Sequence, residues 1–193
     1  MTAKKIIIEK PKRGVIEVTI VGTTSLLTHP FCKETQDKML EQQVSGKKMG
    51  RERKDPQKEF EKSLYPKQNG KHVFPGGGVK MAMVNTAKTF APNIHKTQVT
   101  GEIFIPVDWL EIVGDEPVPR TDMVRVGRNA PDIRIRAEFN NWSMKVPIEF
   151  SENGGLTSEQ ILNLLSLAGF HVGIGDWRPA CRGIHGRFEI AEK

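Results

Sequence analysis

The chain has 193 residues, enough for one domain with sizeable insertions, and its 29 Lys and Arg residues against 23 Asp and Glu residues give a formal net charge of +6. Mean hydropathy is −0.42 and no apolar run approaches the roughly 18 to 20 residues of a membrane span, which excludes a transmembrane protein. Cys32 and Cys181 have no CxxC partner and no His at zinc-finger spacing, and residues 6–8 are too short an apolar stretch for a signal peptide. We therefore expect a cytoplasmic protein with neither a disulfide framework nor a structural metal site.

Alternating, mostly β-branched residues predict a first strand over residues 15–22. Residues 31–72 then break the hydrophobic pattern with Gly and Pro, which predicts a polar insertion that is at best partly helical. Apolar side chains recur at helical spacing from Val79 to Phe90, so an amphipathic helix is expected to end by Pro92.

The second half of the chain contains several strand signals and one helix signal. Strands are predicted over residues 102–105, 109–113, 133–139, 144–150 and 188–191. Asn140 and Asn141 separate two of these strands and predict a hairpin, whereas residues 106–131, rich in Pro, Gly and charge, are interpreted as a second insertion. Thr157 and Gln160 form a capping box that begins a helix, and we expect Gly169 at the position just after its end.

Without the insertions, the predicted order is strand, helix, strand, strand, helix, strand. This βαββαβ order indicates an α+β, ferredoxin-like (RRM-like) domain over residues 1–193, in which two helices cover one face of an antiparallel sheet. The insertions at about 31–72 and 106–131 lie outside this plan. Many functions use the same plan, so function has to be argued from particular residues.

The net positive charge is concentrated in two segments. Residues 1–14 carry five basic and one acidic side chain, and residues 31–72 carry eleven and seven, whereas residues 15–30 and 73–193 each sum to −1. Such segments can simply be solvated surface. The alternative is that residues 1–14 form an arm, and residues 31–72 a protruding insertion, which bind a polyanion. The candidate phosphate contacts are the dense basic run Lys47, Lys48, Arg51, Arg53 and Lys54.

Three consecutive glycines, Gly76, Gly77 and Gly78, precede the first predicted helix, and Lys80 lies in its first turn. Glycines are expected where the backbone approaches something closely or takes a positive φ, and a helix N-terminus with a Lys favours an anion. A nucleotide-binding P-loop requires Ser or Thr after the Lys, but Met81 follows here, so we exclude it and assign no cofactor. The alternative is a tight strand-to-helix turn with Lys80 in solvent.

A second glycine-rich segment lies near the C-terminus. It interleaves glycines and arginines, namely Gly173, Gly175, Gly183 and Gly186 with Arg178, Arg182 and Arg187. Glycine lets backbone amides approach a phosphate, Arg makes forked contacts to it, and Trp177 offers a stacking face for an unpaired base. The alternative is a bulge and turn with Trp177 packed into the core, which we expect for that residue.

Together the two segments resemble motifs of the RAMP superfamily, the CRISPR-associated ferredoxin-like proteins. Pro75, the three glycines after it and Lys80 resemble the P-G-S-S-x-K-G motif, with Gly in place of both serines and Met81 in place of the last glycine. Residues 173–187 resemble the glycine-rich loop of the superfamily, with a longer stretch at 176–182. The resemblance implies a subunit of an antiviral ribonucleoprotein, similar to the backbone subunit that polymerises along a guide RNA, with residues 106–131 in place of its thumb.

The leading hypothesis is a non-enzymatic protein that binds single-stranded RNA or DNA and forms a homo-oligomer or filament. One alternative is a RAMP-type endoribonuclease that uses His29, His171 or His185 as acid or base, and another is a single-stranded DNA-binding or annealing protein. Some backbone subunits cut RNA with an Asp after the first strand, and Asp37 and Asp55 lie in that stretch. Neither has neighbours that single it out, so no catalytic residue is assigned.

Overall fold

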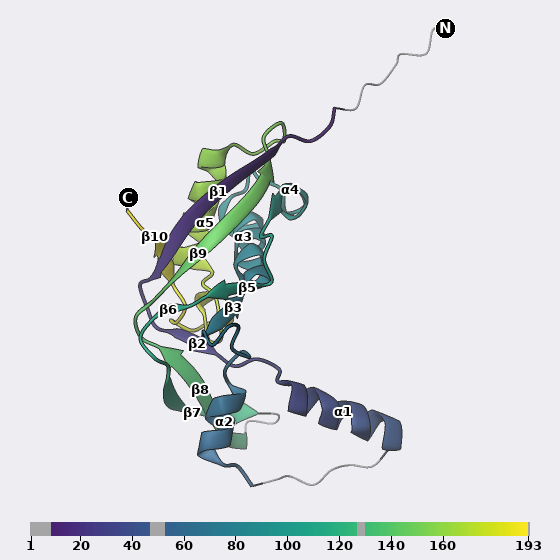
Figure 1. The fold of residues 1–193 in the computed structure, drawn as a ribbon, viewed down its shortest axis with the longest axis vertical. Helices are drawn as coiled ribbons and strands as arrows, with labels where there is room; N and C mark the ends of the chain where they lie inside the picture. Colours follow the sequence, from purple (N-terminus) through teal and green to yellow (C-terminus); the bar gives the residue numbers. More distant parts are fainter. Residues whose placement is uncertain (1–8, 47–52, 127–129, 193) are drawn as a thin grey trace, which may run out of the picture.

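The computed structural model describes residues 9–46, 53–126 and 130–192, and it confirms the expected α+β, ferredoxin-like architecture (Figure 1). The main sheet has the order β10-β1-β9-β4 with every neighbouring pair antiparallel, and in chain order these are the fourth, first, third and second core strands. The core elements are β1 (Arg13–Gly22), α3 (Gly76–Phe90), β4 (Ile103–Phe104), β9 (Trp142–Ser151), α5 (Ser158–His171) and β10 (Phe188–Ile190).

The hydrophobic core lies between this sheet and the helices α3 and α5, which pack side by side on one of its faces (Figure 1). β1 and β9 pair over nine residues, so the alternating apolar side chains of both strands point to the same face, as Ile20 opposite Met144 illustrates. The predicted capping box is confirmed: the Thr157 hydroxyl accepts from the Gln160 N–H, and the Gln160 side chain accepts from the Thr157 N–H.

The expected hairpin at Asn140 and Asn141 is wrong. β8 (Ala130–Phe139) and β9 both form, but they join different sheets. β8 pairs with β7 (Val118–Val126) and with β2 (Leu26–Thr28) in a separate three-stranded sheet. The physical reason is that each strand has a different long partner. β9 pairs along its length with β1, and β8 pairs along its length with β7, so Asn140 and Asn141 connect two separate sheets.

The expected helix end at Gly169 is also wrong, because α5 continues to His171. Gly169 is buried inside the helix, where a Cβ would collide with the Phe188 carbonyl of β10. Glycine at this position therefore allows α5 and β10 to pack closely against each other. The left-handed residue after α5 is Gly173, with φ 67°.

Both expected insertions contain regular structure. Residues 31–72 include α1 (Lys33–Ser45) and α2 (Pro56–Lys62), neither of which buries a residue, and α1 projects from the body (Figure 1). Residues 106–131 include three strands. These are β5 (Trp109–Glu111), which pairs with β3 (Val73–Pro75), β6 (Val113–Gly114), which pairs with β9, and β7.

The remaining elements are α4 (Lys96–Glu102) and a short 3-10 helix, Pro179–Cys181. None of the helices described is both long and apolar enough to cross a membrane.

Candidate nucleic-acid interface

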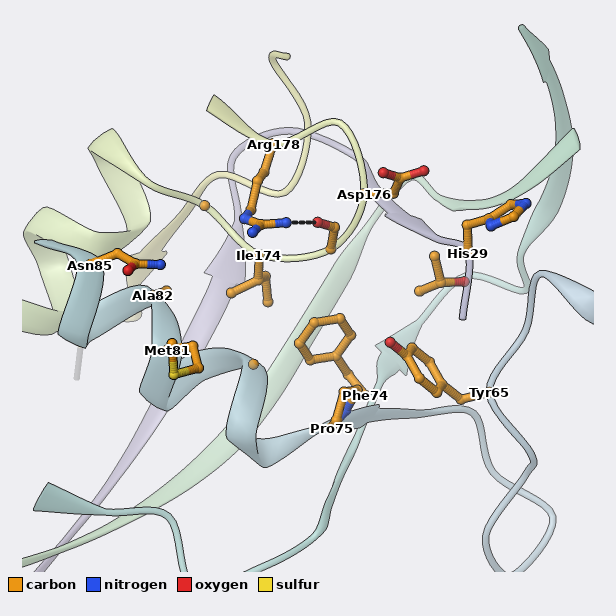
Figure 2. A pocket seen from close by; sticks show the side chains of 14 residues that line it. His29, Tyr65, Phe74, Pro75, Met81, Ala82, Asn85, Ile174, Asp176 and Arg178 are labelled. Carbon is orange, nitrogen blue, oxygen red and sulfur yellow. Dashed lines mark hydrogen bonds between the residues drawn. The ribbon is translucent and has the colours of Figure 1, made fainter. Parts of the chain in front are cut away.

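A cleft of about 300 Å³ lies where the first turn of α3 faces the loop that follows α5 (Figure 2). Gly78 lines it from the first glycine segment, and Gly173, Gly175 and Arg178 line it from the second. The structure thus brings the two glycine-bearing segments, which are far apart in the sequence, to a single site.

The three glycines, expected just before the helix, instead form the first turn of α3, and their surroundings differ. Gly76 packs directly against the Val107 carbonyl, and a Cβ at Gly78 would lie 2.7 Å from the Phe74 ring, so both positions need glycine for internal packing. A Cβ at Gly77 would meet nothing within 4 Å. The first N–H groups of a helix have no partner within it, and the N-cap residue Pro75 provides no side-chain cap. The Gly76 N–H donates to the Asp108 carbonyl at 2.9 Å, so the N–H groups that follow it in this turn are the candidates to bind a ligand.

Lys80 does not reach the cleft. Its ammonium donates to the Thr100 carbonyl at 3.0 Å and lies 4.4 Å from the centre of the Phe104 ring. Both partners belong to the segment formed by α4 and β4, so the geometry separates Lys80 from the glycine amides with which the sequence grouped it.

The four glycines of the C-terminal loop are required by the loop itself. Gly173, Gly175 and Gly186 have φ values of 67°, 79° and 68°, and Gly183 is packed against the Trp177 carbonyl. These positions let the loop fold back onto the chain between β1 and β2, where Gly186 N–H donates to the Ser25 carbonyl at 2.8 Å.

Of the three arginines in this loop, Arg178 lines the cleft, with one guanidinium nitrogen donating to the Gly175 carbonyl at 2.8 Å (Figure 2). Arg182 is exposed after the 3-10 helix. Arg187 donates to the Phe170 carbonyl at 3.2 Å and lies 4.3 Å over the Phe170 ring, at the end of α5. Only Arg178 is therefore placed to act in the cleft.

Trp177 is not in the core, so that expectation is wrong. The residue is 38% exposed, and its backbone has a φ of 50°. The centre of its ring lies 5.9 Å from the guanidinium carbon of Arg120 and 5.6 Å from that of Arg136.

A buried ion network that the sequence did not indicate connects this loop to the β7–β8 hairpin. Arg136, whose side chain is 5% exposed, pairs with Asp122 at 3.0 Å and with Asp176 at 2.7 Å. Arg120 pairs with Asp122 at 3.0 Å and with Glu138 at 3.1 Å. The signal that could have revealed this network is the alternation of charged residues, Arg120 and Asp122 on β7 and Arg136 and Glu138 on β8. It was missed because β7 lies in the segment that was interpreted as the second insertion.

Three of the ionisable groups that line the cleft have shifted pKa values. Partial burial raises the pKa of Tyr65, and the charge of Asp176 acts in the same direction. Partial burial alone would raise the pKa of Asp176, but the hydrogen bond and the charge of Arg136 outweigh it and hold the pKa below its ordinary value. Partial burial lowers the pKa of His29, and the charge of Arg134 acts in the same direction. Near neutral pH, Asp176 is therefore an ion-paired carboxylate and His29 a neutral imidazole.

Three of the other candidate acids and bases have structural partners, namely His171, His185 and Asp55. His171 stacks on Phe90 at 4.1 Å, and His185 is buried with its Nδ1 2.9 Å from the Ser25 hydroxyl. Asp55 caps α2 by accepting from two backbone N–H groups, and Asp37 is exposed on α1. Among the described residues, no group of three or more His, Cys, Asp or Glu side chains is arranged to hold a metal ion.

Only part of the basic run can be placed. Lys47, Lys48 and Arg51 lie outside the described residues, and Arg53 is exposed. Lys54 pairs with Asp132 at 2.8 Å and donates to a β8 backbone carbonyl, so the end of the run is fastened to the strand that also carries Arg136.

The open face of the main sheet does not resemble a nucleic-acid platform. Its two central strands present Glu17 opposite Pro147 and Thr19 opposite Lys145. Along β1 and β9 this face carries no aromatic side chain and nearly balanced charge. Aromatic stacking and positive charge, the two features of a single-strand platform, are therefore lacking on its two central strands, although the edge strand β4 exposes Phe104 opposite Glu149.

Comparisons with known proteins are informative for the fold alone. No protein-family model matches the sequence, and no curated protein matches it. A chain in the structure described as "Cryo-EM structure of the Type III-B Cmr-beta bound to cognate target RNA" is similar, with a TM-score of 0.55 and 12% identity over 94% of this chain and 60% of that chain. Cmr6 from Pyrococcus furiosus aligns with a TM-score of 0.47 and 10% identity over 93% of this chain and 99% of its own. The chain described here thus spans about 60% of the Cmr-beta chain and shares its fold.

Proposed function

We propose that this protein is a RAMP-like subunit that binds single-stranded RNA in the cleft between the first turn of α3 and the loop after α5. The observation that carries the proposal is the meeting, in one cleft, of the two segments that resemble RAMP motifs. The fold similarity to a chain of a complex bound to target RNA supports RNA over DNA as the ligand.

The chemistry of the cleft suits a sugar-phosphate backbone. The positive dipole end of α3 and the N–H groups that follow Gly76 in its first turn favour a phosphate, and Gly77, which is exposed next to the cleft-lining Gly78, leaves that side of the turn open. Arg178 adds a guanidinium that is able to make forked contacts. The negative charge of Asp176 is compensated by Arg136 and does not oppose the phosphate alone. Such contacts are largely independent of sequence.

A substitution at Gly77 tests this proposal without disturbing packing. Gly77→Asp places a carboxylate in the first turn of α3, where it stabilises the helix but repels a phosphate. The matched control is Ser158→Asp, an exposed position in the first turn of α5, away from the cleft. We expect both variants to keep their thermal stability.

Fluorescence anisotropy with labelled single-stranded RNA, and with DNA of the same sequence, gives the affinities. The proposal predicts that Gly77→Asp weakens RNA binding at least tenfold, the scale of about 1.4 kcal/mol for one charge-assisted contact, while Ser158→Asp does not. Equal affinities for the two variants contradict it. Tighter binding to DNA than to RNA favours the annealing-protein alternative.

One observation favours the endoribonuclease alternative: His29 lines the cleft, and its lowered pKa keeps the imidazole in the form of a general base. Incubation of end-labelled RNA with the wild-type protein and with His29→Ala in the presence of a chelator tests it. Cleavage by the wild-type protein that is lost in His29→Ala supports the endoribonuclease. Intact RNA in both reactions contradicts the endoribonuclease and is consistent with binding alone.

We also propose that copies assemble head to tail along the bound strand. α1 supports this because a helix of 13 residues is marginal in water by itself, yet it buries none of them and exposes Met39, Leu40 and Val44. A neighbouring copy on the same strand is the occupant that we assign to this face. Mass photometry on RNAs of increasing length should show a stepwise rise in mass, which Leu40→Gln with Val44→Gln abolishes. One subunit on every length contradicts assembly.

A further inference from the structure

Trp177 lies in the chain between two residues that line the cleft, and its backbone conformation is unusual for a large side chain. Its φ is 50°, a region that bulky residues rarely occupy, and yet 38% of the residue is exposed. Its sequence neighbours Asp176 and Arg178 both line the cleft. Strained conformations persist only where the surroundings impose them, and they gather at binding and active sites.

The surroundings fix the backbone of Trp177 from both sides. Its N–H donates to the Asp176 carboxylate at 3.0 Å, and its carbonyl accepts from the His185 N–H at 3.3 Å. Gly183 packs against the same carbonyl. Asp176 is in turn held by Arg136 at 2.7 Å, so the ion network sets the position of the tryptophan.

The indole ring is equally well positioned. The guanidinium carbons of Arg120 and Arg136 lie 5.9 and 5.6 Å from it, and the His185 ring lies at 5.7 Å with an interplanar angle of 39°. Both guanidinium groups are already paired with carboxylates. We therefore expect them to support the ring by cation–π contact and not to bind a phosphate themselves. A ring with fixed orientation and an exposed part loses little conformational entropy when a flat ligand stacks on it.

We propose that Trp177 is a base-stacking residue, on which an unpaired base of the strand stacks while the adjacent cleft holds the phosphates. This inference rests on the proposed function. The alternative role for the ring is to cover the ion network, in which case its loss affects stability and not recognition of bases.

The experiment compares Trp177→Ala and Trp177→Phe with wild type on two strands: a single-stranded RNA and an abasic strand of the same length. Base stacking contributes about 1–3 kcal/mol, so Trp177→Ala should weaken RNA binding by about 5- to 150-fold at an unchanged salt slope. On the abasic strand it should have no effect, and Trp177→Phe should restore most of the RNA affinity. The matched control is Trp109→Ala, which removes another tryptophan that is 38% exposed, on β5, and should leave RNA affinity unchanged.

Urea unfolding of each variant ensures that the affinities refer to folded protein. Wild-type RNA affinity in Trp177→Ala, or an equal loss on both strands, overturns the stacking role while leaving RNA binding in place. Failure of the wild-type protein to bind either strand instead refutes the proposed function itself. The two failures are therefore distinguishable.

Discussion

Removal of Arg136 tests whether the buried ion network holds the loop that forms the cleft. Its guanidinium joins Asp122 and Asp176, and Arg136→Met leaves Asp122, whose side chain is 9% exposed, with Arg120 as its remaining charged partner among the described residues. Breaking a buried pair by removing one partner costs about 3–5 kcal/mol, compared with about 0–1 kcal/mol for an exposed pair. Because Asp176 is 34% exposed and partly screened, we expect a loss near the lower limit, about 3 kcal/mol.

Urea unfolding at pH 7 measures this loss directly. The control is Arg13→Met, which breaks the 2.8 Å pair with Glu149 at a side chain that is 75% exposed, and should cost less than about 1 kcal/mol. Equal losses in the two variants would show that the network is screened like a surface pair and that the reasoning from burial is wrong.

The same network predicts a pH dependence. The folded pKa of Asp176 is lowered, so its contribution is fully present above the unfolded value, near 3.8, and is lost as the pH falls through the folded pKa. The stability difference between wild type and Arg136→Met should therefore narrow below pH 3.8. A difference that stays constant over that range contradicts the assignment to Asp176.

Three further predictions concern close packing and charge. Gly78→Ala should lower the melting temperature because its Cβ meets the Phe74 ring, whereas Gly77→Ala should preserve or raise it, and equal melting temperatures contradict this contrast. Gly169→Ala should destabilise the fold by about 1–3 kcal/mol in urea unfolding, because its Cβ meets the Phe188 carbonyl, and an unchanged midpoint refutes that packing. Replacement of the basic run by Gln should flatten the slope of log K against log salt by about 0.7 for each phosphate that the run neutralises, while an unchanged slope means a solvated surface. The run comprises Lys47, Lys48, Arg51, Arg53 and Lys54.

Local sequence signals were sufficient for the scaffold. The β-branched alternation of β1 and the capping box of α5 depend on neighbouring residues, and both formed as expected. The hairpin at Asn140 and Asn141 failed because strand partners are chosen by long pairings elsewhere in the chain. Gly169 was misplaced because a glycine that permits close packing and one that ends a helix look alike in sequence.

The candidate site was predicted by segment but not by side chain. Glycine spacing identified both walls of the cleft, and Arg178 lines it. Lys80 and Arg187 have partners elsewhere, on α4 and α5, because side-chain direction depends on tertiary neighbours that the sequence does not display. The exposure of Trp177 and the Arg136 network arise from contacts between the loop and the β7–β8 hairpin, which no local pattern predicts.

Photo-crosslinking tests the central claim most directly, because it shows where the strand lies. Single-stranded RNA containing 4-thiouridine is irradiated with the wild-type protein, and the adducts are located by mass spectrometry. Binding in the cleft predicts adducts within residues 72–85 and 173–187, from the two walls. Adducts confined to the open sheet face, on residues 13–21 and 143–151, or no adducts despite measurable binding, would contradict it.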